Sequence, residues 1–523
     1  MKLLNLTSTF TGDIPPRSTE VVYCGVSTFR DACYQLVSSF LLTYITFSGL
    51  LSVQDTASYL AQMAVISIIV VICRIWDGVN DPIMGWIIER VHFKWGKYKP
   101  WILIGGILNT GVVLTLFLAH PTGWGFVALF GVFYFLWDIV WTINDIAYWS
   151  MLPSLTSDEK RRNNITTAMQ ICISVGVFAV YGAVPLLVGA IPGMSSAEVY
   201  GLIAGVISAL YLVSQIVLVF VCKEHDRTEE TIEEKENGEV RFTDIFRLFG
   251  KNDQFRWIII AILLNYLAAG TLVAFGMYYF YLNYGYGSSK GGNIQFVFTV
   301  MYAVGTLIAQ FLYPLLTKFL NRKQMLLGSG GILLLGYLAL LFLGFPLFGD
   351  TPIAYGSLVW LLYVPAVFIF FGQGIIAIVL IVQLQSTIEY NEYKFGERKE
   401  ALVSSMRALV AKWGSAIQQG LVYGTLAATG LYAVTSEISN LEYMNNAGLY
   451  ENPGQFDADV QAIIDGVTNG QKIGMAMGMI VAPLIIMLAA IAIAAFVFKI
   501  DEKTYNTLVT AIAERKAKDQ TEA

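Results

Sequence analysis

The sequence predicts an all-α membrane protein with twelve transmembrane helices in two halves of six. Hydrophobic residues make up 56% of the chain and charged residues only 14%. Apolar stretches of about twenty residues or more, the length that crosses a bilayer, recur throughout. Lys and Arg gather in every second loop. The twelve spans are expected at residues 22–50, 58–88, 100–119, 123–152, 166–190, 198–222, 257–282, 294–317, 325–347, 354–383, 401–431 and 473–498.

The charge of the loops predicts how these helices are oriented. The loops that follow odd-numbered spans contain only two basic residues, Lys290 and Lys472. The loops on the other side are rich in Lys and Arg, and residues 223–256 alone contain seven. Because basic loops remain in the cytoplasm, we expect both termini there and a location in the plasma membrane, the inner membrane of a bacterium. The partners expected are therefore the lipid bilayer and small solutes, with no nucleic acid.

The charged stretch at 223–256 divides the chain in the middle and is expected to be a solvated cytoplasmic linker. We expect a six-helix half at 1–222, a second at 257–499 and a cytoplasmic tail at 500–523. The outward loop at 433–470 is acidic and is expected to contain short helices, without an assigned role.

Two carboxylates in the second span are the most informative polar residues. Asp77 and Asp81 lie four residues apart, so on a helix they share one face, with Asn80 beside them. A single charge inside a bilayer costs several kcal/mol, and two like charges cost more unless a positive group joins them. The pair therefore predicts a site for a cation.

Further ionisable residues are expected inside other spans: Arg30, Asp31, Arg74, Asp138, Asp145, Arg407 and Lys412. Buried acid–base pairs can simply lock helices together. Here acids are expected on three helices and a lysine on a fourth, which is more than a structural lock needs. We therefore favour a ligand site.

The spacing around Asp145 favours a sugar as the second ligand. Trp149 follows one helical turn later on the same face. A carboxylate can accept bonds from two hydroxyls, and a flat aromatic ring packs against the C–H face of a sugar. Arg30 can donate several bonds to the same hydroxyls.

Five segments resemble one known family, the glycoside–pentoside–hexuronide:cation symporters of the major facilitator superfamily, and they are spread over both halves. They are Arg74–Trp86 (RIWDGVNDPIMGW), Trp95–Leu103 (WGKYKPWIL), Thr142–Ser150 (TINDIAYWS), Leu384–Tyr393 (LQSTIEYNEY) and Lys412–Ala416 (KWGSA). The resemblance implies that fold, with the substrate bound near the membrane midplane between the halves.

The resemblance also implies a cation site and residues that couple it to transport. The residues at the positions of the family's Na⁺-type cation site are Asp77, Asn80, Asp81 and Thr142. Lys412 matches a lysine that the family places near these acids, and Arg74, one turn from Asp77, is expected to neutralise an acid there.

The resemblance assigns the sugar site to Asp31, Asp145 and Trp149, with Arg30 where the family often has a basic residue. The family's arginine early in the fifth span is absent, and ungapped counting places Gln170 there. Glutamine can hydrogen-bond but has no charge, so the identity of the sugar stays open.

The expected function is cation-coupled symport of a sugar or glycoside. Two carboxylates, an amide and a hydroxyl favour Na⁺ or Li⁺ over a proton, and no other cofactor is expected. The alternative is a carrier of lysolipids or other amphiphiles with the same fold, which would need a wide apolar pocket. An enzyme is not expected, since the sequence has no phosphate-binding loop, His-based metal motif or Ser/His/Asp set in a soluble domain. A sensor would need a longer signalling tail.

Overall fold

The computed structural model describes residues 9–10, 15–52, 55–91, 93, 96–155, 159–188, 190–191, 194–222, 224–225, 249–349, 351–396, 400–446, 448–450 and 452–522. The chain forms two compact units. The first contains residues 1–238, 280–296 and 430–467, and the second contains 239–279, 297–429 and 468–523. The first unit thus includes two segments from the predicted second half.

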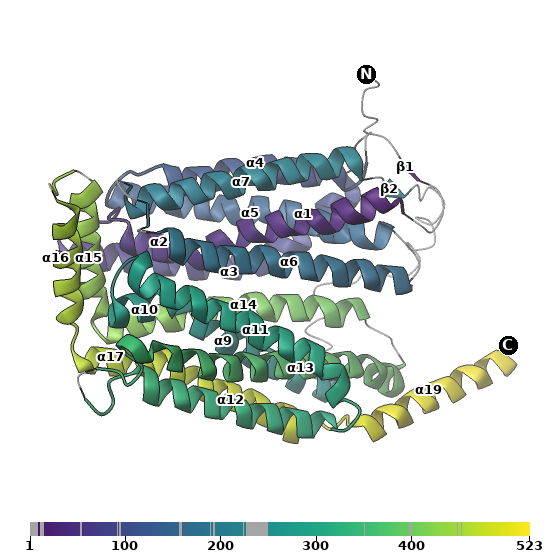
Figure 1. Ribbon diagram of the computed structural model, residues 1–523. Coiled ribbons are helices and arrows are strands. Elements are labelled where there is room, and N and C mark those ends of the chain that lie inside the picture. Colours follow the sequence, from purple (N-terminus) through teal and green to yellow (C-terminus); the bar gives the residue numbers. More distant parts are fainter. Residues whose placement is uncertain are drawn as a thin grey trace. The chain divides into compact units, whose positions relative to one another are not determined.

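The first unit is a bundle of long helices (Figure 1). Its elements are β1 (Thr9–Phe10), α1 (Arg17–Gln35), η1 (Leu36–Phe40), α2 (Leu41–Phe47), α3 (Thr56–Arg90), α4 (Lys99–Leu118), α5 (Trp124–Leu155), α6 (Glu159–Leu187), α7 (Ser196–Val221), β2 (Glu224–His225), η2 (Ser288–Gly292), α15 (Leu431–Asn446) and α16 (Pro453–Asp465). The two short strands pair in parallel.

The first predicted span is a helix with one wide turn in its middle. α1 continues through the π-helical turn η1 into α2. Such turns interrupt the regular hydrogen bonds of an α-helix and frequently occur at functional sites. The wide turn begins five residues after Asp31.

Close packing holds α1, α4, α5, α6 and α7 together around the polar residues. α1 packs on α6 and α7, and α4 packs on α5 and α7. Tyr23 of α1 donates to the carbonyl of Tyr148 on α5 at 2.7 Å, and Tyr148 donates back to the carbonyl of Tyr23 at 2.6 Å. Gly105 lets α4 approach α5, because a Cβ there would lie 2.8 Å from the backbone nitrogen of Asn144. The positions of α1 and α5 are therefore fixed beside the candidate site.

The helices α15 and α16 confirm the expectation of short helices at 433–470, and α15 packs on α2 and α3. The backbone N–H of Gly49 donates to Ser439 at 3.1 Å. Glu442 is buried, and its Oε1 accepts from Ser196 at 2.8 Å and from Tyr286 at 2.6 Å. Burial raises the pKa of Glu442 to about 7. Its contacts join α15, the N-terminus of α7 and the loop before η2.

The second unit is built from the remaining helices. They are α9 (Asp253–Ala274), α10 (Gly276–Tyr284), α11 (Asn293–Leu316), α12 (Arg322–Gly344), η3 (Gly356–Leu362), α13 (Tyr363–Phe395), α14 (Glu400–Ala428), α17 (Asn469–Ala476), η4 (Met477–Val481), α18 (Ala482–Ala492), η5 (Ile493–Val497) and α19 (Glu502–Glu522). Residues 280–284 of α10 and 293–296 of α11 belong to the first unit. The main packing pairs are α12 with α13, α9 with α14, and α9 with α18.

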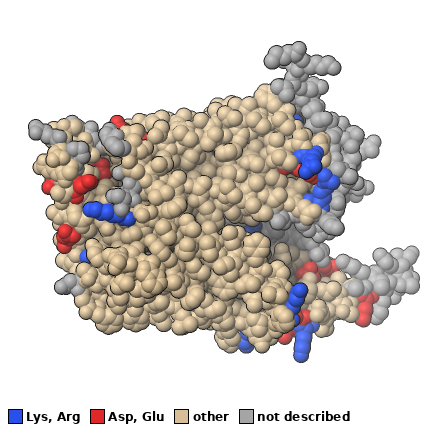
Figure 2. Space-filling model, viewed as in Figure 1, with Lys and Arg blue, Asp and Glu red and all other residues tan. Residues whose placement is uncertain are grey.

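Ten helices among the described residues are long and apolar enough to cross a membrane. The other two predicted spans, 22–50 and 401–431, are also largely helical, as α1–η1–α2 and as α14. They contain Arg30 with Asp31 and Arg407 with Lys412, respectively. Charged side chains on the visible face lie mainly near the helix ends (Figure 2). The all-α membrane class is confirmed, while the full count of twelve stays a prediction.

Candidate functional site

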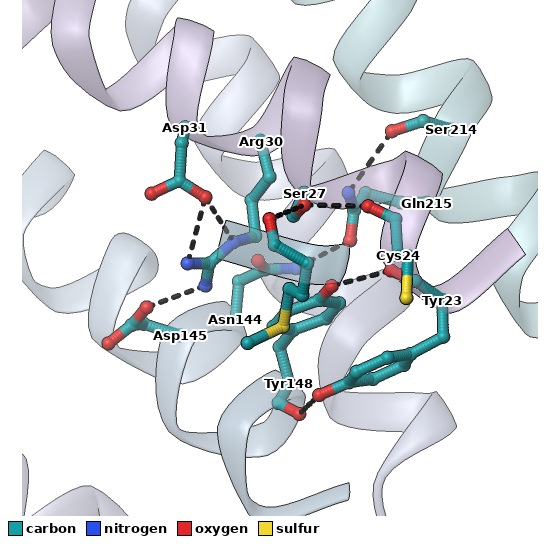
Figure 3. A network of polar contacts seen from close by, with 11 residues as sticks. Tyr23, Cys24, Ser27, Arg30, Asp31, Asn144, Asp145, Tyr148, Ser214 and Gln215 are labelled. Carbon is teal, nitrogen blue, oxygen red and sulfur yellow. Dashed lines mark hydrogen bonds and ion pairs between the residues drawn. The ribbon is translucent and has the colours of Figure 1, made fainter. Parts of the chain in front are cut away.

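Arg30 is the centre of the candidate sugar site. Its side chain is buried and lies between two carboxylates (Figure 3). Nη2 is 3.1 Å from Asp31 Oδ2, and Nη1 is 2.6 Å from Asp145 Oδ1. Asp31 follows Arg30 on α1, whereas Asp145 comes from α5. The structure therefore brings together three residues that the sequence predicted for the sugar site.

Aromatic rings surround the same guanidinium. The Arg30 Cζ atom lies 4.5 Å from the ring centre of Tyr148, 5.3 Å from that of Trp141 and 5.9 Å from that of Trp149. A cation over an aromatic face is attracted by the negative face of the ring, most strongly when water is excluded. The three rings and two carboxylates hold Arg30 in one orientation.

The exposed fraction increases from the buried Arg30 to the two carboxylates and Trp149, so a ligand could reach the last three. The Arg30 side chain is only 2% exposed, while that of Asp31 is 16% exposed and that of Asp145 is 33% exposed. Trp149 is 37% exposed. Arg30 uses one oxygen of each carboxylate, so Asp31 and Asp145 each have a second oxygen that can accept a hydroxyl. The accessible surface thus offers acceptors beside a flat ring, as a polyol needs.

The predicted cation residues also lie together, on α3 and α5. Thr142 Oγ1 is 3.4 Å from Asp77 Oδ1 and 3.4 Å from Asp81 Oδ1. Asp77, Asn80 and Thr142 are buried, and Asp81 is half-buried. The Asn80 amide nitrogen has no hydrogen-bond partner among the described residues. Hard oxygen ligands from two carboxylates, a hydroxyl and an amide fit a small cation.

Arg74 lies in an aromatic environment on the same helix as the cation residues. Nη1 lies 3.4 Å from the hydroxyl of Tyr34, and Cζ lies 5.6 Å from the ring centre of Trp137. Asp138 on α5 is also buried. The coupling role of Arg74 stays a prediction.

Three of the predicted residues lie on other helices, α6 of the first unit and α14 of the second. Gln170 on α6 is exposed, and its carbonyl accepts from Ser174 at 3.0 Å. Lys412 is half-buried and Arg407 is exposed on α14 of the second unit. The sugar role of Gln170 and the coupling role of Lys412 stay predictions.

Sequence reasoning missed the residues that contact Arg30 or hold α5 in place. Trp141 and Tyr148 both contact Arg30, and their spacing of −4 and +3 from Asp145 would have found them. Asn144 donates to the carbonyl of Ile102 at 2.9 Å and to Gln215 at 3.0 Å. This second contact joins α5 to α7, and nothing in the local sequence indicates it.

Long apolar helices that contain two polar clusters are the arrangement expected of a membrane transporter. A family model described as MFS/sugar transport protein matches residues 30–502. The chain therefore belongs to the MFS/sugar transport protein family.

Curated relatives are similar over much of the chain. A raffinose carrier protein of Pediococcus pentosaceus is 27% identical over 75% of this chain and 59% of its own length. A lactose permease of Lactobacillus helveticus is 28% identical over 78% of this chain and 62% of its own length. A putative glycoside/cation symporter of Escherichia coli (strain K12), YagG, is 24% identical over 71% and 76%, respectively. The chain spans about three fifths of the first two relatives.

Solved structures share the fold. A bacterial homologue of the human lysosomal transporter Spinster, in an inward-facing conformation, aligns with a TM-score of 0.58 at 16% identity, over 94% of this chain and 97% of that one. A D-xylose–proton symporter aligns with a TM-score of 0.53 at 13% identity, over 91% and 96%. At this identity the likeness concerns the fold alone.

Proposed function

We propose that the protein is a cation-coupled sugar symporter that works by alternating access in the plasma membrane, with both termini in the cytoplasm. The arrangement of Arg30 between Asp31 and Asp145, beside the accessible ring of Trp149, supports this most directly. The relatives named for raffinose, lactose and glycoside transport support the same substrate class.

In the proposed mechanism, Arg30 orients the two carboxylates, and these accept the hydroxyls of the sugar. Sugar hydroxyls would donate to the carboxylate oxygens that do not bind Arg30, while the sugar ring packs on Trp149. Charge-assisted hydrogen bonds of this kind are about twice as strong as neutral ones. Since the guanidinium is already paired and buried, little reorganisation is needed when the sugar arrives.

The proposed coupling depends on α5, which contributes to both sites. Thr142 and Asp145 lie three residues apart on this helix, so one belongs to the cation group and the other to the sugar group. A cation would neutralise the repulsion between Asp77 and Asp81 and fix the local position of α5. Coupling between two ligands is reciprocal, so each should raise the affinity of the other by the same factor.

We infer that the coupling cation is Na⁺, with Li⁺ and the proton as the alternatives. A proton needs only one acid, whereas this group offers two carboxylates, an amide and a hydroxyl on two helices. Lys412 is the proposed coupling residue of the second unit, and the Lys412→Ala variant should reduce transport more than sugar binding.

Isothermal calorimetry in nanodiscs tests the proposal. Mono- and disaccharides are titrated at fixed pH with Na⁺, and again with choline replacing Na⁺. We expect at least one sugar to bind, with an affinity that Na⁺ increases. Equal sugar affinity in both salts would refute Na⁺ coupling. If no sugar bound but a lysolipid did, the carrier would be one for amphiphiles.

A further inference from the structure

A second polar cluster follows the sugar site along α1. Gln35 comes one turn after Asp31 and Ser39 comes at the next turn, within the wide turn η1. Gln35 Nε2 donates to Tyr181 of α6 at 2.7 Å and also to Ser39, and Ser39 Oγ lies 3.1 Å from the Tyr181 hydroxyl. Three polar side chains from two helices therefore meet beyond Asp31.

The partial exposure of this cluster indicates that it faces a polar space and not lipid. Asp31, Gln35, Ser39 and Tyr181 are all half-buried, whereas the neighbours Leu36, Val37 and Phe40 are buried. Helix faces that meet lipid tails are apolar, because unsatisfied polar groups are costly there. A face with a carboxylate, an amide and a hydroxyl at successive turns is instead typical of a substrate pathway.

The spacing of these residues matches a chain of sugar rings. An α-helix rises about 1.5 Å per residue, so the four residues from Asp31 to Gln35 advance about 6 Å along α1, and Ser39 lies further on, in η1. This step is close to the length of one pyranose ring. If the first ring of a disaccharide binds at Asp31 and Asp145, its second ring would lie beside Gln35 and Ser39.

The cluster also has the chemistry that a second ring requires. Both N–H groups of the Gln35 amide are used within the cluster, so its Oε1 can accept a sugar hydroxyl. Tyr181 adds an aromatic ring, which packs beside Phe40 with 5.7 Å between ring centres. An amide oxygen next to an aromatic face offers the same kind of contact as Asp145 next to Trp149.

The packing of α1 against α6 does not depend on this cluster. α1 and α6 are already joined by the bond from Ser27 to the carbonyl of Met169 at 3.2 Å. They also approach closely at Gly176, where a Cβ would collide with the carbonyl of Thr28. The packing of these two helices is thus established without Gln35, Ser39 and Tyr181.

We propose that Gln35, Ser39 and Tyr181 form a subsite for the second ring of a disaccharide or longer glycoside, and that this subsite gives such substrates preference over monosaccharides. The proposal rests on the proposed sugar-symport function.

Binding of matched glycosides to the full-length protein in nanodiscs tests the subsite. Methyl galactoside and methyl glucoside represent one ring, and lactose and cellobiose represent two. We expect the wild type to bind one disaccharide at least five times more tightly than the corresponding methyl glycoside. Gln35→Ala and Tyr181→Phe should each weaken disaccharide binding about three- to twentyfold, while methyl glycoside affinity changes less than twofold.

A matched control and a mild variant make the test specific. Ser67→Ala removes a half-buried hydroxyl that, among the described residues, donates to the carbonyl of Met63 on its own helix, and this variant should change neither affinity. If Gln35→Ala does not fold, Ser39→Ala replaces it in the same binding measurements. An equal loss for one-ring and two-ring sugars, or a wild type without disaccharide preference, would overturn the subsite. Binding of no sugar at all would instead overturn the proposed function.

Discussion

The pairing of Arg30 with Asp145 gives the sharpest prediction for the sugar site. We consider Asp145→Asn, which keeps the shape of the side chain but removes its charge. Nη1 of Arg30 is 2.6 Å from Asp145, and the Arg30 side chain is only 2% exposed. Removing one partner of a buried ion pair typically costs about 3–5 kcal/mol. The Asp145 side chain is one-third exposed, and Arg30 also keeps Asp31 and an aromatic environment. We therefore expect a smaller loss of about 1–2 kcal/mol in unfolding free energy.

The effect of Asp145→Asn on sugar binding should be larger than the effect on stability. The variant loses a charged acceptor for sugar hydroxyls, worth about 1.5–3 kcal/mol for a hydrogen bond to a charged group. Since 1.4 kcal/mol is about a factor of ten in affinity, the dissociation constant should rise about ten- to a hundredfold. Calorimetry with the best sugar measures this, and thermal unfolding in the same nanodiscs measures stability.

Asp138→Asn is the matched control, because Asp138 is a buried acid on the same helix, two turns before Asp145. It should leave the sugar affinity within about threefold of the wild type, since Asp138 has no contact with Arg30 among those described. The reasoning fails if Asp145→Asn binds sugar within twofold of the wild type while remaining folded. It fails equally if both variants lose sugar affinity to the same extent.

Three further predictions concern other parts of the first unit. Asp77→Asn should abolish the effect of Na⁺ on sugar affinity while sugar still binds in choline, and a persistent Na⁺ effect in the same titration would contradict the assigned cation site. The pKa of Glu442 is raised from 4.5 to about 7 when α15 is packed. The packed state therefore favours the protonated acid, and the packing of α15 should lose stability as pH rises from 4.5 to 7. Hydrogen exchange of residues 431–446 should then be faster at pH 7.5 than at pH 5 after correction for intrinsic rates, and Glu442→Gln should remove that difference. Gly105→Ala should lower the unfolding temperature, because its Cβ would lie 2.8 Å from the Asn144 nitrogen and overpacking costs about 1–3 kcal/mol; Gly111→Ala, where nothing lies within 4 Å, is its control.

The fold class and the main polar residues could be predicted because membranes restrict sequences strongly. A charged residue in an apolar span has few explanations, so Asp77, Asp81 and Asp145 were identifiable without a structure. Helical spacing predicted that Trp149 shares a face with Asp145, and both lie beside Arg30. The family resemblance, and not the spacing, grouped Thr142 with Asp77 and Asp81. The same reasoning could not establish that Arg30 binds both Asp31 and Asp145, because that contact depends on how α1 packs against α5.

The residues that the sequence did not reveal act through tertiary contacts. Tyr23 and Tyr148 exchange hydrogen bonds between α1 and α5, yet each alone resembles any other membrane tyrosine. The burial of Glu442 could not be predicted either, because an acid in a loop between predicted spans is normally solvated. It becomes buried only because Ser196 and Tyr286, far away in sequence, supply its hydrogen bonds.

In the proposed mechanism, the geometry of α5 would let one ligand affect the other without a long pathway. Thr142 lies 3.4 Å from both cation-site carboxylates, and Asp145 lies 2.6 Å from Arg30 less than one turn later. A small rotation of α5 that draws Thr142 toward a cation must also move Asp145 relative to Arg30. Because Tyr148 fixes the next turn to Tyr23 on α1, this rotation cannot be absorbed freely further along the helix. Cation binding would therefore select one position of Asp145, and a sugar that fits this position would favour the cation in return.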